Sequence, residues 1–216
     1  MSSNLKKRIF SSIIILPISF FFILKGSFLF IFFLFLLYII SCQEWLKIAG
    51  EFRFKILGLI FLFISFYLTY SVRAEGFYLF LIIIIICVST DLGGYFCGKL
   101  FKGPKLSKIS PNKTYSGMLG SFIFAVIISY FFYNLIDYGI IFNKKIFFSL
   151  NYNFILFVIF ISLVSQSGDI FISYFKRKSK IKDTGKIFPG HGGLLDRIDG
   201  MIFAFPAAYF TYIILV

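Results

Sequence analysis

The stretch FILFVIFISLVSQSGDIFISYF, residues 154–175, decides the fold, because it is long and apolar enough to cross a bilayer as a helix. About 20 apolar helical residues span roughly 30 Å of hydrocarbon. Hydropathy marks six further runs of this kind, at about 9–25, 27–43, 54–72, 76–97, 116–136 and 200–216. A soluble core of this size cannot bury them all. The sequence therefore predicts an all-α, polytopic membrane bundle of about seven transmembrane helices.

The composition agrees with a membrane environment. Of the 216 residues, 59% are hydrophobic and only 14% are charged, whereas about 25% of an average soluble domain is charged. No linker, repeat or soluble-length segment separates the spans. We therefore expect a single integral membrane domain, 1–216.

The basic residues alternate between the two sides of this topology. The N-terminus and the second, fourth and sixth loops hold 18 of the 22 Lys and Arg residues, whereas the opposite side holds only Lys25, Arg73, Lys144 and Lys145. Because cytoplasmic loops are enriched in Lys and Arg, this pattern predicts a cytoplasmic N-terminus. Anionic lipid headgroups beside these loops account for much of the net charge of +13, so no nucleic-acid partner is needed.

Carboxylates are scarce, and five of the nine stand out by their positions. Asp91 and Asp169 lie inside apolar spans, where an ionised carboxylate is costly unless it faces a polar cavity, a cation or a metal. The other three, Asp183, Asp196 and Asp199, lie in the sixth loop. Asp196 and Asp199 are three positions apart, so at a helix start both can point towards one or two hard cations.

Polar residues form a stripe on the span 154–175. At helical spacings of three and four, one face carries Ser162, Ser165, Gln166, Asp169, Ser173 and Lys176. A weaker stripe on the span 76–97 consists of Asp91, Tyr95 and Lys99. Serine and glutamine stripes often join helices through hydrogen bonds alone. A carboxylate in each stripe instead favours a functional cavity inside the bundle.

The sixth loop combines basic side chains with glycines. Lys and Arg can neutralise phosphate oxygens, and the glycines of Pro189–Gly193 allow the backbone to approach a ligand closely. We assign His191 to phosphate contact or loop organisation ahead of general-base catalysis. For Lys178 and Lys180 alone, positive-inside flanking is the simpler interpretation. The chain has no Walker loop and no GxSxG elbow, so magnesium-assisted phosphate chemistry fits best.

The fourth loop is a second basic segment, running from Gly98 and Lys99 to Lys113 and Thr114. Ordinary turn chemistry also explains its Gly, Pro and Lys content. In this topology the fourth and sixth loops face the same side of the membrane. We therefore expect the two loops to close on one polyanionic substrate.

The sixth loop and its neighbours resemble one enzyme family. Ser173–Arg177, Lys182-Asp183, Pro189–Gly193 and Asp196–Asp199 together closely resemble the signature of phosphatidate cytidylyltransferases, also called CDP-diacylglycerol synthases. Gln166–Asp169 resembles the Q-x-G-D element of this family. The resemblance extends to a second conserved region, at Asp91–Gly98 and Ser110–Gly117. It marks a catalytic half at about 88–216.

This resemblance implies that CTP reacts with phosphatidic acid to give CDP-diacylglycerol and pyrophosphate. It also implies Mg²⁺, with a metal pair held by Asp169 and Asp196, and leaves open whether the second ion is divalent or monovalent. The other residues implied in catalysis are Lys182, Asp183 and Asp199, of which the two Asp rank lower as metal ligands. The residues implied to contact substrate are Ser173, Lys176, Arg177, His191, Gly192, Gly193, Arg197, Asp91 and Lys113.

Two positions depart from the family pattern, because Ile172 and Ser116 stand where a Glu is common. Two other functions stay open. A CTP-dependent polyprenol or dolichol kinase would transfer the γ-phosphate, and a transporter would also carry intramembrane Asp residues. The expected partners are CTP, phosphatidic acid and the bilayer, with a homodimer left open and no nucleic acid. We expect a bacterial inner-membrane location with the active site towards the cytoplasm.

Overall fold

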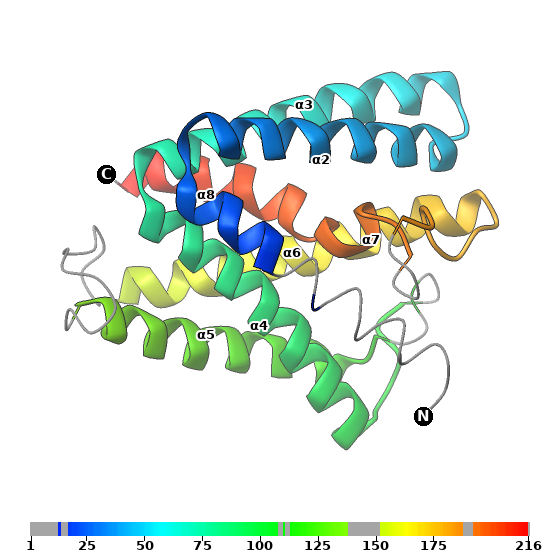
Figure 1. Cartoon of the computed structure of the whole chain (residues 1–216). Coiled ribbons are helices and arrows are strands. Elements are labelled where there is room, and N and C mark those ends of the chain that lie inside the picture. The colour runs from blue at the N-terminus through cyan, green and yellow to red at the C-terminus, as the bar shows by residue number, and fades with distance from the viewer. Residues whose placement is uncertain are drawn as a thin grey trace. The chain divides into compact units, whose positions relative to one another are not determined.

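The structure is a computed structural model that describes residues 13, 17–107, 110, 113–137, 152–187 and 192–215. Residues 17–25 are helical. The helices that follow are α2 (Ser27–Ile48), α3 (Phe52–Glu75), α4 (Phe77–Phe101), α5 (Tyr115–Asp137), α6 (Tyr152–Lys178), α7 (Leu195–Ile198) and α8 (Met201–Leu215) (Figure 1). An isolated antiparallel bridge pairs Lys105 with Thr114. The predicted all-α class is confirmed for this part of the chain.

Among the described residues, five helices, α2 to α6, are long and apolar enough to cross a membrane. They correspond to the predicted spans 27–43, 54–72, 76–97, 116–136 and 154–175, so a multi-pass membrane protein is confirmed. Helix α8 has only 15 residues, or about 22 Å of helix, which is shorter than the hydrocarbon core. Of the predicted span 9–25, the structure describes only residues 13 and 17–25, which are helical. Seven crossings and a cytoplasmic N-terminus therefore stay predictions.

The chain divides into two compact units. The first contains the described residues of Met1–Tyr70 together with Phe175–Ile198, and the second contains those of Ser71–Tyr174 together with Asp199–Val216. Helix α6 contributes to both, since Asp169 and Ser173 belong to the second unit and Lys176 belongs to the first. The prediction of a single membrane domain stays a prediction.

In the first unit, the side chain of Trp45 holds the helical hairpin of α2 and α3 together. The turn between the helices contains Gly50 with φ of 60°, a backbone conformation that favours glycine. The indole of Trp45 is 4% exposed and donates a hydrogen bond from Nε1 to the Phe54 carbonyl oxygen at 3.0 Å. It lies directly against Gly58, where any side chain would overlap it. The ring of Phe175, 4.8 Å away between centroids, packs the end of α6 on this hairpin.

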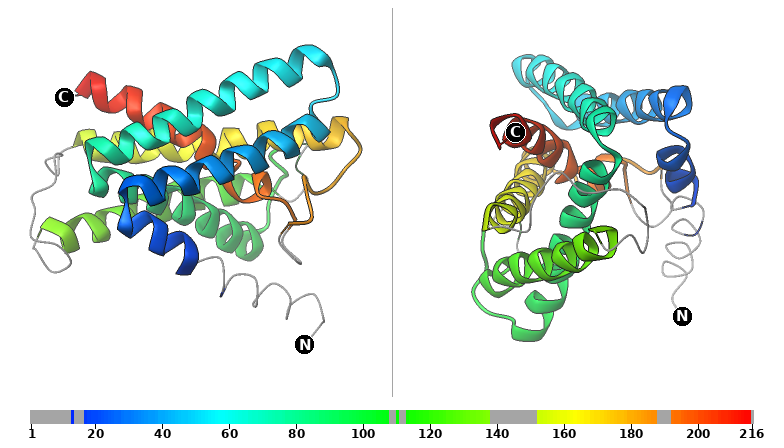
Figure 2. Two further views of the ribbon diagram at one scale, coloured as in Figure 1. Left: turned by 45° about the horizontal axis from the view of Figure 1, so that its top comes forward. Right: turned by 90° about the vertical axis from the view of Figure 1, so that its left-hand side faces the viewer.

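In the second unit, glycines let α4 and α5 run side by side in close contact (Figure 2). A Cβ atom on Gly93 would come 2.5 Å from the carbonyl oxygen of Gly120. Ser121 of α5 donates to the Thr90 carbonyl oxygen at 2.7 Å, and the Thr90 hydroxyl donates to Ser162 of α6 at 2.8 Å. These contacts follow the rule that small residues let membrane helices approach and that hydroxyls join them.

The N-terminal part of the predicted polar stripe on α6, Ser162 and Ser165, contributes to helix packing. Ser162 and Ser165 are buried. Ser162 accepts the Thr90 hydrogen bond, and Ser165 lies where a side chain on Gly200 would overlap it. For these serines the simpler interpretation, that hydroxyls join helices, is confirmed. The stripe takes on charged partners only from Asp169 onwards.

We predict that Gly93→Ala lowers the thermal unfolding temperature of the purified protein in detergent. Alanine is the better helix former by about 1 kcal/mol, but overpacking costs about 1–3 kcal/mol, and here the obstacle is backbone. Gly76→Ala is the control, because the nearest atom to its new Cβ is a side-chain carbon 3.8 Å away. Equal unfolding midpoints for the two variants would contradict the close packing of α4 on α5.

Candidate active site

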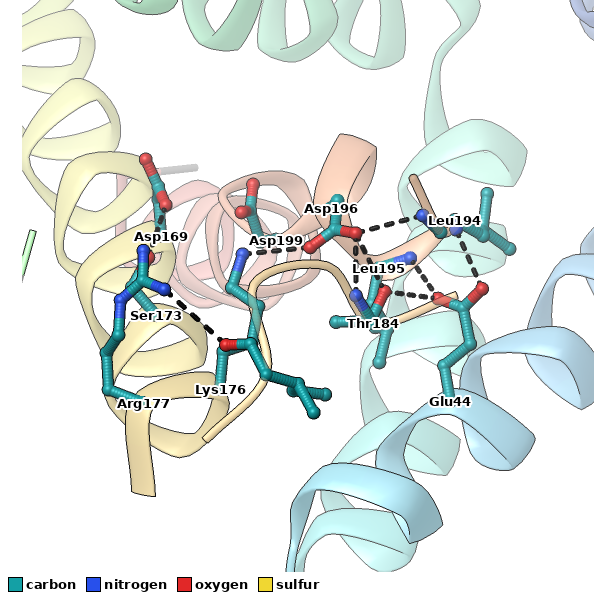
Figure 3. Close-up of polar contacts among 12 residues, drawn as sticks. Glu44, Asp169, Ser173, Lys176, Arg177, Thr184, Leu194, Leu195, Asp196 and Asp199 are labelled. Atoms are coloured by element: carbon teal, nitrogen blue, oxygen red, sulfur yellow. Dashed lines mark hydrogen bonds and ion pairs between the residues drawn. The ribbon is translucent and has the colours of Figure 1, made fainter. Parts of the chain in front are cut away.

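The Asp196 carboxylate lies at the centre of a polar cluster in the first unit (Figure 3). Its Oδ1 atom accepts a hydrogen bond from the Lys176 ammonium at 2.8 Å, and the two side chains are only 7% and 11% exposed. Its Oδ2 atom accepts from the backbone N–H groups of Thr184 at 2.8 Å and Gly193 at 2.9 Å, and the Thr184 hydroxyl lies 3.1 Å away. Both oxygens are therefore occupied, Oδ1 by a donor from α6 and Oδ2 by donors from the loop that follows α6.

These donors set the ionisation of Asp196. Burial raises the pKa of its carboxyl group, but the hydrogen bonds from Lys176, Gly193 and Thr184 outweigh burial and hold the pKa below its ordinary value. Asp196 is therefore ionised at neutral pH. Its negative charge is kept in a nearly water-free position by donors that come from two turns of the same loop and from α6.

The end of α6 turns the chain so that this loop returns to Lys176. Lys180 has φ of 55°, and the Ile181 amide donates back to the Lys176 carbonyl oxygen at 2.9 Å. Backbone hydrogen bonds of this kind supply donors to the otherwise unpaired carbonyl groups at the C-terminus of a helix. The hydroxyl of Ser179 donates to the Ile48 carbonyl oxygen at 2.6 Å, which ties the turn to α2. The turn delivers Thr184 to Asp196.

Glu44 is a member of this cluster that sequence reasoning missed. Its carboxylate is 1% exposed. It accepts hydrogen bonds from the Thr184 hydroxyl at 2.7 Å and from the amides of Leu194 and Leu195 at 3.0 and 2.8 Å. The predicted span ended at residue 43, which put Glu44 in a loop, whereas α2 continues to Ile48. A carboxylate directly before a tryptophan at the end of an apolar run was the available signal.

The Asp169 carboxylate organises a second polar cluster, which lies in the second unit. Its Oδ2 atom pairs with the Lys113 ammonium at 2.7 Å, and the Ser173 hydroxyl donates to its Oδ1 atom at 3.2 Å. Lys113 also donates to the Gln166 carbonyl oxygen at 3.3 Å. The side chains of Lys113 and Asp169 are 24% and 30% exposed, so this pair is reached by solvent more than the Asp196 pair. This pair joins the end of the fourth loop to α6, while the closing of the fourth and sixth loops on one substrate stays a prediction.

The start of α5 places Lys113. The Thr114 hydroxyl accepts the Gly117 amide at 3.1 Å, which is the usual cap of a helix N-terminus. Leu106 donates to the Lys113 carbonyl oxygen at 2.8 Å, so the preceding strand-like segment fixes the same residue from the other side. Ser116, one of the two departures from the family pattern, donates to the Lys102 carbonyl oxygen at 2.7 Å and so helps to fold this turn. The other departure, Ile172, is 1% exposed and packs as an apolar core residue.

The remaining predicted site residues have different surroundings. Asp91 is exposed on α4, and Asp199 accepts the amide of Gly200 at 2.9 Å. Four further predicted site residues in this loop and its flanks are exposed, namely Arg177, Lys182, Asp183 and Arg197. His191 lies outside the described residues.

Gly192 and Gly193 fit the Asp196 cluster because they lack side chains. Gly192 has φ of 86°, and a Cβ atom there would come 2.7 Å from the Asp196 Oδ2 atom. A Cβ atom on Gly193 would overlap the Thr184 hydroxyl and approach both oxygens of Glu44. Here the backbone closely approaches the protein's own carboxylate, and the predicted approach of these glycines to a ligand stays a prediction.

The chain is similar to known proteins over most of its length. The cytidylyltransferase family matches residues 51–215. This chain belongs to that family. It is 36% identical over 98% of its length to a phosphatidate cytidylyltransferase of Rickettsia felis, of which it covers 93%. A phosphatidate cytidylyltransferase of Rickettsia conorii is 38% identical over 93% of this chain and 87% of its own, and one of Staphylococcus aureus is 36% identical over 71% and 56%. The predicted family is confirmed.

In this cytidylyltransferase, the carboxylates of Asp169 and Asp196 have the chemistry of magnesium ligands, but they would supply only part of the coordination shell of a metal ion. Carboxylate oxygens suit Mg²⁺, which usually takes one or two protein carboxylates and completes its shell with water and substrate phosphates. Among the described residues, no group of three or more His, Cys, Asp or Glu could hold a metal ion. Asp169 and Asp196 each carry a lysine ammonium instead. The ammonium groups mark a cation position at each carboxylate.

We predict that Lys176→Met destabilises this cytidylyltransferase by about 3–5 kcal/mol, because it leaves the buried Asp196 charge without its cation. The matched control is Lys178→Met, two residues further along the chain. Lys178 pairs with Glu51 at 2.7 Å, but these side chains are 40% and 61% exposed, and exposed pairs contribute about 0–1 kcal/mol. Thermal unfolding in detergent compares the two variants, and a larger loss in Lys178→Met would contradict the burial argument.

Proposed function

We propose that this protein transfers the CMP group of CTP to phosphatidic acid, forming CDP-diacylglycerol and pyrophosphate for phospholipid synthesis. The observation that carries the proposal is the similarity along nearly the whole chain to a phosphatidate cytidylyltransferase. Membership of the cytidylyltransferase family supports a CTP-using enzyme. Five membrane-length helices agree with a lipid substrate.

In the proposed reaction, a phosphate oxygen of phosphatidic acid forms a bond to the α-phosphorus of CTP. The bond from this phosphorus to the bridging oxygen of the β-phosphate breaks, and pyrophosphate leaves with the electron pair. Because the attacking phosphate is already an anion, no strong general base and no covalent protein nucleophile are needed. Positioning and neutralisation of the phosphate charges carry the rate enhancement.

We assign the metal pair of the proposed enzyme to Asp169 and Asp196. A bound Mg²⁺ would neutralise phosphate oxygens and favour departure of pyrophosphate. Support comes from the position of each carboxylate beside a lysine ammonium, at 2.7 and 2.8 Å, since a site that holds one cation suits another. Lys113 and Lys176 then have phosphate oxygens as alternative partners. Whether the second ion is divalent or monovalent stays open.

The other predicted residues keep supporting roles in this proposal. Lys182, Arg177 and Arg197 are exposed cations suited to phosphate groups. Asp183 and Asp199 accompany them as catalytic candidates, while Ser173 holds Asp169 in place through its hydrogen bond. Gly192 and Gly193 allow close approach of the loop, and the assignments of Asp91 and His191 to substrate contact stay predictions.

The proposed topology puts this chemistry at the cytoplasmic face of a bacterial inner membrane. The bias of Lys and Arg towards alternate loops supports a cytoplasmic N-terminus and seven crossings in one membrane domain. CTP is then available on the side where the fourth and sixth loops lie. A homodimer stays a prediction.

We predict that the purified protein, given phosphatidic acid, CTP and Mg²⁺, produces CDP-diacylglycerol detectable by lipid mass analysis. Label in the α-phosphate of CTP enters the lipid, because the transferred group is CMP. Label in the γ-phosphate leaves with pyrophosphate. Transfer of the γ-label to the lipid, with none of the α-label, would instead indicate a lipid kinase.

We predict that Asp169→Asn and Asp196→Asn each abolish magnesium-dependent formation of CDP-diacylglycerol while the protein still inserts in the membrane. Each change removes a negative charge that the proposal uses to hold the cation. Glu51→Gln is the control, because Glu51 is an exposed carboxylate that pairs only with the surface residue Lys178 among the contacts described. Near-normal turnover in either Asp variant would overturn the metal assignment.

A further inference from the structure

Glu44 and Asp196 both contact the same threonine, Thr184. The Thr184 hydroxyl oxygen lies 2.7 Å from Oε2 of Glu44 and 3.1 Å from Oδ2 of Asp196. A hydroxyl has a single proton, so the shorter contact makes Glu44 its main acceptor. The Thr184 backbone amide donates to Asp196 at 2.8 Å. Thr184 therefore connects the two carboxylates, one through its side chain and the other through its backbone.

The second link between the two carboxylates is the turn at Gly193. The Gly193 amide donates to Asp196, and the next two amides, of Leu194 and Leu195, donate to the two oxygens of Glu44. Three consecutive backbone N–H groups are thus divided between the two carboxylates. Leu195 begins α7, so Glu44 fixes the start of the short helix that carries Asp196.

The burial of Glu44 makes this arrangement rigid. At 1% exposure, a carboxylate without donors would be strongly unfavourable. Its three donors all come from the loop 184–195, and none of them can move away without leaving a buried charge short of hydrogen bonds. The position of Glu44 in α2 is itself fixed, because the adjacent Trp45 is held by Phe54 and Gly58 of α3.

From these contacts we infer that Glu44 is a positioning residue, which holds Thr184 and the Gly193 turn so that their amides orient the Asp196 carboxylate for cation and phosphate binding. The inference rests on the proposed function and names a component of the same site. Glu44 lies outside the residues 51–215 that match the family, whereas all three of its donors lie inside them. The N-terminal part of the chain thereby supplies a part of the active site.

The first test compares Glu44→Gln with Glu51→Gln in the full-length protein. A glutamine keeps the size of Glu44 but turns an NH₂ group towards one of the donors. Changes to groups that orient a ligand-bearing residue typically cost about 10- to 100-fold in activity or metal affinity. We expect a loss of this size in kcat/KM for CTP and a higher Mg²⁺ requirement in Glu44→Gln, and less than a twofold change in Glu51→Gln.

A role for Glu44 in folding alone gives a different result. In that case Glu44→Gln lowers the unfolding temperature, while kcat, KM and the Mg²⁺ requirement of the folded fraction equal those of the wild type. That outcome overturns the inference. The fraction folded is measured in the same detergent preparation used for the kinetics.

The second test uses Thr184 to identify the path between the carboxylates. Thr184→Ser retains the hydroxyl and is expected to keep most of the activity, whereas Thr184→Val has nearly the same shape but no hydroxyl. Because the hydroxyl acts through Glu44, the double variant Glu44→Gln/Thr184→Val should lose less activity than the product of the two single losses. Independent, multiplicative losses, or equal activities of Thr184→Ser and Thr184→Val, overturn the path.

Hydrogen exchange separates this inference from the proposed function, because it needs no substrate. We expect the amides of residues 193–195 to exchange at least tenfold faster in Glu44→Gln than in Glu51→Gln, a change of about 1.4 kcal/mol in local opening. If the wild-type protein forms no CDP-diacylglycerol, the proposed function fails while this readout still decides the role of Glu44. Equal exchange in the two variants overturns the inference.

Discussion

The loop that bears the family motif depends on one buried ion pair, between Lys176 and Asp196. The Asp196 side chain is only 7% exposed, so its charge must be stabilised by hydrogen bonds in place of water. The donors are the Lys176 ammonium of α6 and the backbone amides of Thr184 and Gly193. The same hydrogen bonds that keep the charge also fix the backbone of Thr184 and Gly193. The conformation of this loop and the ionised state of Asp196 therefore depend on the same hydrogen bonds to a buried carboxylate.

The two lysine–aspartate pairs solve this problem in different environments. Lys113 and Asp169 are each about one-quarter to one-third exposed and can be reached by ions and substrate from solution. Lys176 and Asp196 are nearly enclosed, and the Asp196 oxygens already have four donor contacts. Exchange of a ligand for an ammonium group is therefore easier at Asp169. This difference gives the two proposed metal positions unequal access.

Much of this architecture could be predicted because apolar helices leave a long, continuous signal. Five of the expected spans are present, and the motif residues from Ser173 to Asp199 carried the family without any structural information. The pairing of Lys113 with Asp169 was not predicted, because the sequence placed Lys113 in a loop and Asp169 inside a span without indicating that the two side chains meet. The spacing of the serines in the α6 stripe did not predict their roles. Ser162 forms a hydrogen bond to another helix, whereas Ser173, three turns further on, donates to a carboxylate.

Glu44 could not be assigned from the sequence, because its partners are 140 to 151 positions away and leave no periodic pattern. Its neighbour Lys47 made the region look like an ordinary charged helix end. The placement of α7 was equally hidden, since a helix of four residues is too short to have a hydrophobic period. Both features arise from hydrogen bonding between distant segments rather than from local preference.

The packing at Gly193 limits how this loop can evolve. Any side chain there would meet Thr184 and both oxygens of Glu44, so a larger residue is tolerated only if those partners shrink at the same time. A change at Gly193 is therefore coupled to the residues at positions 184 and 44, and the side chains that fit at these three positions depend on one another.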